Sequence, residues 1–178
     1  IPPYRLLLLD DVLTDKQRLQ IEVIVDRLAK KEPIQYILGE TTFCGLPFHV
    51  SRDVLIPRPE TEQLVRLIVN DFSSCPSPRI LDIGTGSGCI AISLASLLPA
   101  SCVTALDISS SALRVAADNA TLNHVSVSWT CVDILSSEAE SCLEQYDCIV
   151  SNPPYIMEHE QLEMDASVLG YEPHKALF

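Results

Sequence analysis

The segment Asn152-Pro153-Pro154-Tyr155 combines residue types that could hold a planar amine or amide. The two prolines fix the backbone, so the Asn152 side chain and the Pro153 carbonyl would stay aimed at one place. Both groups accept hydrogen bonds, and together they could hold the two hydrogens of an –NH2 group. Tyr155 offers a flat face on which a planar target could stack. The alternative is a purely structural Pro-Pro turn.

Chemistry at such a turn would depend mainly on orientation. An amide nitrogen is a poor nucleophile because its lone pair is delocalised. When both of its N–H bonds are held, the nitrogen can become pyramidal and face a methyl carbon about 3–3.5 Å away. The carbonyl acceptors would also stabilise positive charge growing on nitrogen, and a sulfonium leaving group needs no strong base. We therefore predict that Asn152, Pro153 and Tyr155 are catalytic in methyl transfer and that these three and Pro154 contact the substrate.

A glycine-rich segment follows a short apolar run and begins at Asp82. Its glycines permit a tight turn and a close approach of a ligand, and the helix after it would offer free N–H groups. The spacing is G-x-G-x-G rather than the dinucleotide pattern G-x-G-x-x-G, which favours a carboxylate and an ammonium over a pyrophosphate. The methionine half of S-adenosylmethionine carries both groups. A tight structural turn is the alternative, and the predicted cofactor contacts are Gly84, Thr85, Gly86, Ser87 and Gly88.

Polar residues also end the other predicted strands. Asp107 could accept hydrogen bonds from both hydroxyls of a ribose, although an aspartate in such a place is often a helix cap. Asp133 could accept a hydrogen bond from an adenine amino group, and Ile134 could pack on the ring. Asp133 could equally end its strand in an ordinary turn. Asn152 is expected to border the same cofactor.

The apolar pattern predicts the elements that would bring these residues together. Strands are expected over residues 80–83, 103–106, 125–132 and 146–150, with one helix over 89–98 and another capped by Ser109. Alternating strands and helices indicate βαβ units and a parallel sheet, and continuous apolar strands fit burial on both faces. Each polar residue above follows the carboxyl end of a strand, where open α/β sheets bind ligands. We therefore predict a doubly wound, mostly parallel α/β fold.

The first part of the chain has a helical pattern. Thr14 and Gln17 predict a capping box for a helix that ends near Lys31, because Pro33 follows. The apolar stripe of this helix comprises Ile21, Ile24, Val25 and Leu28.

A hairpin is expected over residues 41–43 and 47–50, split by Gly45. Pro59 is well placed to begin a helix over residues 60–71, with Leu64, Leu67 and Ile68 facing inward. The predicted division of the chain is a helical N-terminal domain for substrate recognition, a hairpin linker and a cofactor-binding domain, over residues 1–40, 41–56 and 57–178.

Composition argues against several classes of protein. Asp and Glu number 24 against 12 Lys and Arg, for a formal charge of −12, and no basic stripe typical of nucleic-acid binding is present. The acidity would keep the protein soluble or help it dock on a basic partner. No apolar run approaches the ~20 residues of a membrane span. The seven cysteines lack a C-x-x-C pair, so we expect reduced core thiols of an intracellular protein and no metal site.

These motifs resemble class I S-adenosylmethionine-dependent methyltransferases, and more narrowly the release factor glutamine methyltransferases, the HemK family. Many methyltransferases share the Gly-rich turn, and adenine-N6 DNA methyltransferases share N-P-P-Y, whereas Q-Y-I-L-G and P-R-P-E-T-E are more specific. The resemblance rests on Pro33-Ile34-Gln35-Tyr36-Ile37-Leu38-Gly39, Phe43, Gly45, Ile56-Pro57-Arg58-Pro59-Glu60-Thr61-Glu62, Asp82 to Gly88, Asp107, Asn119, Asn152 to Tyr155 and Tyr171-Glu172-Pro173.

The resemblance implies a Rossmann-like methyltransferase fold that uses S-adenosylmethionine to methylate the glutamine of the Gly-Gly-Gln loop in peptide chain release factors. It also implies that Glu60 and Thr61 border the methionine end of the cofactor. The family has a larger helical N-terminal domain and a longer sheet, so we expect this chain to be a piece that is incomplete at its C-terminal end. A release factor would be the partner, without membrane or direct nucleic-acid contact, in the cytoplasm or an organelle matrix.

Other functions compete with this one. An adenine-N6 nucleic-acid methyltransferase would use the same turn on a flipped base, but the charge of −12 argues against it. A cofactor-binding module without catalysis is disfavoured by the intact segment 152–155. A nicotinamide dehydrogenase is disfavoured by the glycine spacing and by the lack of a proton-relay residue near the turn. A sister family that methylates a ribosomal-protein glutamine departs from P-R-P-E-T-E.

Overall fold

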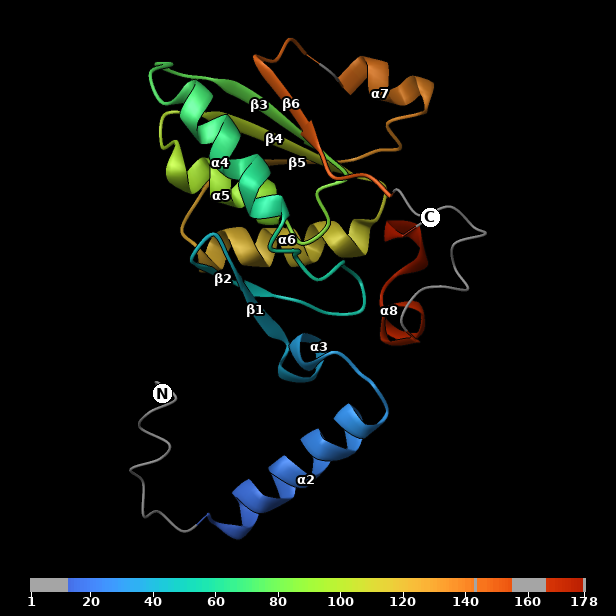
Figure 1. Cartoon of the computed structure of the whole chain (residues 1–178). Helices are drawn as coiled ribbons and strands as arrows, with labels where there is room; N and C mark the ends of the chain where they lie inside the picture. The colour runs from blue at the N-terminus through green and yellow to red at the C-terminus, as the bar shows by residue number, and fades with distance from the viewer. Residues whose placement is uncertain (1–12, 143, 155–165, 178) are drawn as a thin grey trace.

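A four-stranded parallel sheet forms the centre of the chain in the computed structural model, which describes residues 13–142, 144–154 and 166–177 (Figure 1). Its order is β5-β4-β3-β6. Strand β3, which comes first in the sequence, therefore lies between β4 and β6. This topology confirms the predicted mostly parallel α/β fold. The strands are β3 (Arg79–Ile83), β4 (Cys102–Asp107), β5 (Ser128–Cys131) and β6 (Cys148–Ser151).

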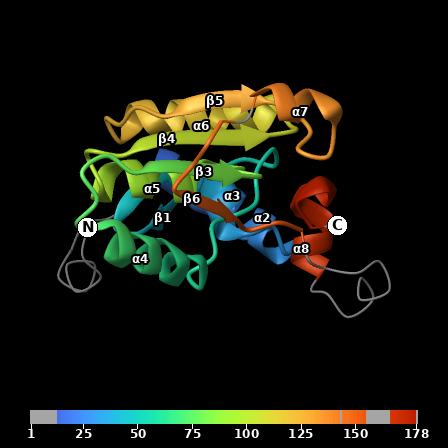
Figure 2. The ribbon, with the colours of Figure 1, turned by 90° about the horizontal axis from the view of Figure 1, so that it is seen from above.

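Helices cover both faces of the sheet, as Figures 1 and 2 show. One face carries α4 (Thr61–Phe72), α5 (Cys89–Leu97) and α6 (Ser110–Leu122), and the other carries α7 (Ser137–Cys142). Ile80, Val103 and Val150 join the apolar core on the first face, while Leu81, Leu106 and Val132 pack with Ala139 of α7 on the second. Because the strands are buried from two sides, their sequences are nearly continuous apolar runs.

A hairpin lies outside the main sheet and contacts α6. Its strands, β1 (Glu40–Phe43) and β2 (Leu46–His49), pair antiparallel around a two-residue turn. Cys44 and Gly45 in that turn have φ values of 50° and 78°, the left-handed conformation that tight hairpin turns require. Phe43 and Phe48 are buried and pack edge to face, with ring centroids 6.2 Å apart, which anchors the hairpin on the helical layer.

Two helices precede the hairpin, α2 (Asp15–Ala29) and the short α3 (Ile34–Leu38). The expected capping box is present, since the Thr14 hydroxyl accepts from the Gln17 N–H and the Gln17 side chain accepts from the Thr14 N–H. No residue of α2 is buried, and Val25 and Leu28 of the predicted apolar stripe are 54% and 42% exposed. Figure 1 shows α2 standing away from the sheet. Local sequence therefore fixes where this helix begins without fixing what covers its apolar side.

Polar contacts tie α2 and α3 to the segment that follows the hairpin. Arg27 donates two hydrogen bonds to the Glu32 carboxylate, at 2.7 and 2.8 Å, and Arg52 donates a third at 3.3 Å. The bond from Arg27 is the main cause that holds the pKa of Glu32 at about 2. The Tyr36 hydroxyl donates to the Val54 carbonyl at 2.6 Å, and burial raises the pKa of this phenol above its usual range.

Some expectations differ from the structure. Strand β5 begins at Ser128 instead of residue 125, because the chain is still leaving a turn in which His124 has a φ of 57°. Leu67 was expected to face inward but is 63% exposed, since the buried positions of α4 are Val65 and Ile68. Helical spacing fixes which residues share a face but not which face turns toward the sheet.

The cysteine prediction was partly wrong, because Cys102 and Cys131 are exposed instead of lying in the core. Cys44, Cys75, Cys89 and Cys148 are half-buried, and these four and the two exposed cysteines are free thiols. No group of His, Cys, Asp and Glu among the described residues has the arrangement of a metal site. Within the same part of the chain, no helix has both the length and the apolar character needed to span a bilayer.

We expect Tyr36→Phe to lower the free energy of unfolding by about 1–1.5 kcal/mol, because the ring still packs but the Val54 carbonyl loses its donor. Urea unfolding followed by circular dichroism measures the change. Tyr146→Phe is the matched control, since the structure gives that half-buried hydroxyl no hydrogen bond to a described residue. Equal losses in the two variants would contradict the role of the Tyr36 hydroxyl.

Candidate active site at the carboxyl ends of the strands

The Gly-rich turn between β3 and α5 is built on the backbone of β4. The N–H groups of Gly84 and Thr85 both donate to the Leu106 carbonyl, at 2.9 and 3.0 Å. The N–H of Gly86 donates to a carboxylate oxygen of Asp107 at 2.8 Å. Since three successive residues of the turn bond to the end of β4, pairing of β3 with β4 sets the path of the turn.

The glycines of this turn differ in what surrounds them. At Gly88, which has a φ of 81°, an added Cβ would lie 2.8 Å from Ile92 and 3.1 Å from Ala116, so α5 and α6 approach closely here. At Gly84 and Gly86, also at positive φ, an added Cβ would meet nothing within 4 Å. Packing against Ala116 and Ile92 therefore adds to the preference for glycine that the positive φ of Gly88 sets, whereas described atoms leave open space beside Gly84 and Gly86.

Asp82 is a buried carboxyl beneath the turn. One of its oxygens accepts from the Thr85 hydroxyl at 2.6 Å and from the Ala91 N–H at 3.3 Å. The other oxygen, Oδ1, is buried and has no partner among the described residues. Burial raises the pKa of Asp82 to about 6. The sequence signal for Asp82 was an acidic residue inside an apolar strand. A hydrogen-bond donor on a ligand would satisfy its Oδ1 atom.

Asp107 shapes the site through its hydrogen bonds to the backbone. Besides the bond from Gly86, its Oδ1 accepts from the Ser109 N–H at 2.9 Å. The Ser109 hydroxyl in turn accepts from the Ala112 N–H at 3.2 Å, which confirms the predicted cap of α6. Each oxygen of Asp107 retains a lone pair, so it can still accept from a ribose hydroxyl.

The residues after β5 form an ordinary turn. Asp133 is exposed and accepts from the Leu135 N–H at 2.9 Å, which is the structural role left open for it above. Ile134 is half-buried and packs with the core cluster that includes Leu81 and Leu106. Their roles toward an adenine remain predictions.

The segment after β6 lies beside the Gly-rich turn. Ser151 is in register with Ile83, and its hydroxyl donates to the Ile83 carbonyl at 2.8 Å. Gly84 and Asn152 are the residues that follow this pair on two adjacent parallel strands. Asn152 is half-buried and Pro153 and Pro154 are exposed, whereas Tyr155 lies outside the described residues.

The loop before α4 is tied to the C-terminal part of the chain. Arg58 donates to Glu172 at 2.6 Å, and the Glu172 side chain is only 1% exposed. Glu60 is exposed and Thr61 is half-buried at the start of α4, and within the described ranges no hydrogen bond joins either side chain to the Gly-rich turn. Their contact with a cofactor therefore stays a prediction. The Arg58–Glu172 pair was not foreseen from the sequence.

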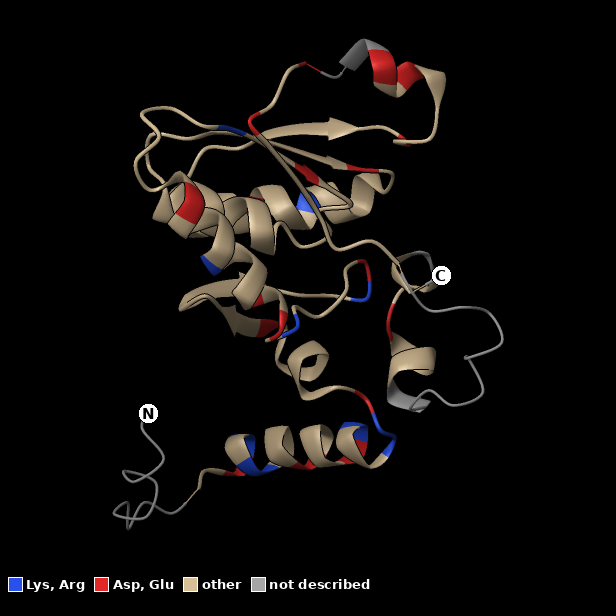
Figure 3. Ribbon diagram, turned by 45° about the horizontal axis from the view of Figure 1, so that its top comes forward, with Lys and Arg blue, Asp and Glu red and all other residues tan. Residues whose placement is uncertain are grey.

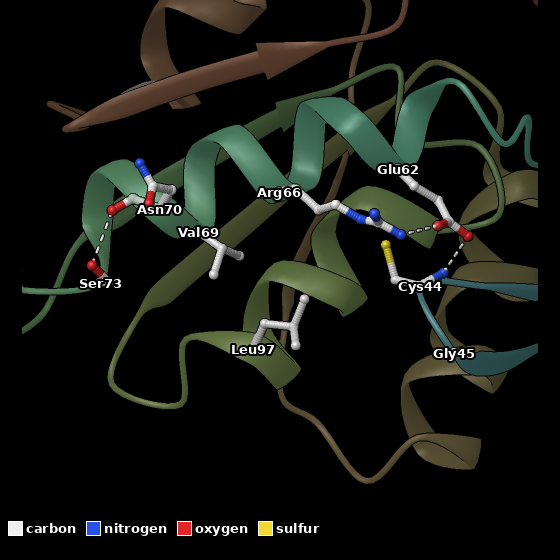
Figure 4. A pocket seen from close by; sticks show the side chains of 8 residues that line it. All are labelled: Cys44, Gly45, Glu62, Arg66, Val69, Asn70, Ser73 and Leu97. Atoms are coloured by element: carbon white, nitrogen blue, oxygen red, sulfur yellow. Dashed lines mark hydrogen bonds and ion pairs between the residues drawn. The ribbon is translucent and has the colours of Figure 1, made fainter.

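A separate groove of about 660 Å³ lies between the hairpin turn, α4 and the end of α5 (Figure 4). Glu62 joins two of its walls, because it accepts from the Cys44 N–H at 2.9 Å and pairs with Arg66 at 3.0 Å. Leu97, at the end of α5 opposite the Gly-rich turn, also lines the groove. The groove is therefore distinct from the candidate site at the strand ends.

Comparison with known families agrees with this architecture. Residues 60–169 match the Methyltransferase small domain, which is more than half of the chain. The chain belongs to this family. Residues 2–39 match the PrmC N-terminal domain. The hairpin lies between the two matched segments, because the match to the methyltransferase small domain begins at residue 60.

Several of the curated relatives that match this chain share a name. Proteins called release factor glutamine methyltransferase from Flavobacterium psychrophilum and Bacteroides thetaiotaomicron are 51% and 48% identical to it. The first alignment covers 93% of this chain and 59% of the relative, and the second covers 95% and 60%. The chain thus spans about three fifths of the length of these relatives.

Solved structures show the same fold at low identity. An S-adenosylmethionine-dependent methyltransferase from Agrobacterium tumefaciens superimposes with a TM-score of 0.53 at 22% identity, over 65% of this chain and 39% of that one. The N-terminal domain of human METTL16 superimposes with a TM-score of 0.52 at 23% identity, over 64% and 48%. These likenesses confirm the Rossmann-like methyltransferase fold.

Gly88→Ala should destabilise the methyltransferase domain more than Gly84→Ala. Both positions have positive φ, which costs an alanine roughly 1–2 kcal/mol. Only at Gly88 would the new methyl group also collide with Ile92. Thermal unfolding of the two variants measures the difference, and equal shifts of the midpoint would contradict the close packing at Gly88.

The contribution of Asp82 to the free energy of unfolding should decrease as the pH rises from about 4 to about 6. Burial raises the pKa of Asp82 from 3.8 to about 6, so the folded state binds more protons than the unfolded state in this window. At about 1.36 kcal/mol per unit, the loss approaches roughly 3 kcal/mol. Asp82→Asn should remove this part of the pH dependence of urea unfolding, and an unchanged slope would assign it to another group.

Proposed function

We propose that this chain is the cofactor-binding and catalytic part of a protein that methylates the glutamine of the Gly-Gly-Gln motif in peptide chain release factors, on the side-chain amide nitrogen. The observation that carries the proposal is the register of Ile83 with Ser151, because Gly84 and Asn152 follow it on adjacent strands. The names of the curated relatives support the same substrate.

The residues of the turn fit S-adenosylmethionine, which would supply a methyl group on a sulfonium. Asp82 Oδ1 is a buried acceptor without a described partner, and a nearby ammonium group would stabilise its ionised form. The open backbone at Gly84 and Gly86 leaves room for the methionine end. Asp107 would accept from the ribose hydroxyls. Thr85, Ser87 and Gly88 would hold the shape of the turn, and Asp133 with Ile134 would border the adenine.

Asn152 and Pro153 would orient the glutamine amide. The Asn152 side-chain oxygen and the Pro153 carbonyl would each accept one hydrogen of the amide, which would aim the nitrogen lone pair at the methyl carbon. The same acceptors would stabilise the positive charge that develops on nitrogen. Pro154 would keep the segment rigid, and Tyr155 would stack on the amide plane.

A protein substrate is also favoured over a nucleic acid by the charge distribution. Beyond residue 60 the only basic residues in the sequence are Arg66, Arg79, Arg114 and Lys175. In Figure 3, the basic segments on the sheet and the helices that cover it are separated by acidic and other segments. A phosphate backbone would meet no basic track there.

The proposal also assigns a role to each part of the chain. Residues 1–40 would belong to a helical substrate-recognition domain, residues 41–56 would link it to the catalytic part, and residues 57–178 would hold the cofactor. A location in the cytoplasm, expected from the sequence, also stays a prediction.

A competition assay tests the reaction. The full-length protein is given labelled S-adenosylmethionine together with an unmodified release factor and an adenine-containing DNA duplex, and mass spectrometry locates the methyl group. We expect the label on the Gly-Gly-Gln glutamine. Label on adenine would keep the cofactor but overturn the substrate, and no label on either would contradict catalysis.

Asn152→Ala should abolish transfer while leaving the dissociation constant of S-adenosylmethionine within about threefold. Loss of a contact made in the transition state lowers kcat much more than it weakens cofactor binding. Isothermal titration calorimetry and the transfer assay measure the two quantities. Asn70→Ala, on the exposed side of α4, is the matched control. Retained transfer with lost cofactor binding would overturn the role given to Asn152.

A further inference from the structure

We propose that Asn119 couples the hairpin to the Gly-rich turn, so that a ligand held by the turn and the order of the hairpin stabilise each other. The inference rests on the proposed function, because it takes the turn to be the cofactor site. Asn119 acts here as a positioning residue, since its side chain bonds backbone groups of two separate elements.

The Asn119 side chain is fully buried in α6, and it uses both of its donors and one of the two acceptor lone pairs on its oxygen. Its Nδ2 donates to the Ser87 carbonyl at 2.9 Å and to the His49 carbonyl at 3.0 Å. Its Oδ1 accepts from the His49 N–H at 2.6 Å. Aspartate has the same shape but no hydrogens to donate, so it would place a carboxylate against two carbonyl oxygens.

On one side, this contact fixes the end of the Gly-rich turn. Holding the Ser87 carbonyl orients the peptide group between Ser87 and Gly88. The same face of α6 meets Gly88 at Ala116, whose Cβ lies 3.1 Å from where a Cβ on Gly88 would stand. Two residues of α6 therefore support the turn, and a shift of α6 would displace it.

On the other side, the contact holds the last residue of the hairpin. The Asn119 amide bonds both backbone groups of His49, as a neighbouring strand would. His49 is in register with Glu40, and the next residue, Val50, donates to the Gly39 carbonyl at 3.0 Å. Hydrogen bonds through the Asn119 side chain and the hairpin backbone thus connect the Gly-rich turn with the end of α3. The proposal assigns α3 to substrate recognition.

Coupling of this kind is reciprocal, because each event lowers the free energy of the other by the same amount. A ligand that orders the turn should strengthen the hold on His49. A hairpin that is well ordered, for example through contact with a protein substrate, should raise the affinity for the cofactor.

Asn123 offers a matched control on the same helix. Its Nδ2 donates to the hairpin carbonyl of Pro47 at 2.8 Å and to the Asn119 carbonyl at 2.9 Å. It therefore attaches the hairpin to α6, but its described bonds do not reach the Gly-rich turn. Asn123→Ala removes one contact at Pro47 and leaves in place the bonds of Asn119 to His49 and Ser87, through which the coupling is proposed to act.

The first test needs no variant. Amide hydrogen exchange is followed by nuclear magnetic resonance in the full-length protein, with and without S-adenosylhomocysteine. The His49 N–H should exchange at least about fivefold more slowly with the ligand, the low end of typical coupling. The Cys44 N–H, which bonds to Glu62 at the opposite end of the hairpin, should change less. Equal slowing at both amides would overturn the coupling.

The second test uses calorimetry and kinetics. Asn119→Asp should raise the dissociation constant of S-adenosylhomocysteine roughly 5- to 50-fold and remove the selective slowing at His49. The KM for S-adenosylmethionine should rise while kcat at saturation stays within about threefold, since the reacting groups are intact. Asn123→Ala should leave the dissociation constant within about twofold.

The outcomes separate the two proposals. If the wild-type protein binds no S-adenosylhomocysteine, the proposed function and the coupling both fail. If it binds the ligand but Asn119→Asp and Asn123→Ala have the same affinity, only the coupling is wrong.

Discussion

The candidate site depends on one constraint, the parallel pairing of β3 with a strand on each side. The register aligns Ile83 with Leu106 and with Ser151, so the segments after β3 and β6 emerge next to each other. Hydrogen bonds from Gly84 to β4 and from Ser151 to β3 then hold these segments at the carboxyl end of the sheet. A slip of one residue would exchange the side chains of β3 between the two helix-covered faces and disrupt the packing on both, so burial of the sheet protects the geometry of the site.

Buried polar side chains join the remaining parts to this sheet. Both polar atoms of the Asn119 side chain have partners, whereas Asp82 and Glu172 each keep one buried oxygen without a described partner. An unpaired buried acceptor costs about 1–3 kcal/mol, so a donor supplied by a ligand adds stability at such a place. Beside the Gly-rich turn, the proposed cofactor would link binding to folding through Asp82. At Glu172, the pair with Arg58 ties the loop before α4 to the end of the chain.

Sequence reasoning succeeded where the signal is local or follows from the sheet. The cap at Ser109 and the strand-end positions of Asp107 and Asn152 needed only neighbouring residues and parallel topology. The contact between Asn119 and His49 spans 70 residues, and that between Arg58 and Glu172 spans 114, so no local pattern announces either partner. On α4, Ile68 and Leu64 pack on the core side as expected, whereas Leu67 does not, because periodicity does not give the exact rotation of a helix about its axis. The ligand contacts of Asn152 and Asp133 stay predictions.

The order of the strands also determines when the candidate site can form during synthesis of the chain. The central strand, β3, obtains its second neighbour only when Ser151 has been made, 68 residues after Ile83. A ribosome that adds roughly 5–20 residues per second needs several seconds for that stretch. During this interval the nascent chain holds the Gly-rich turn without the Asn-Pro-Pro segment beside it. The whole site therefore forms only after β6 has been made, and a ribosome that stalls before β6 would leave one edge of β3 open.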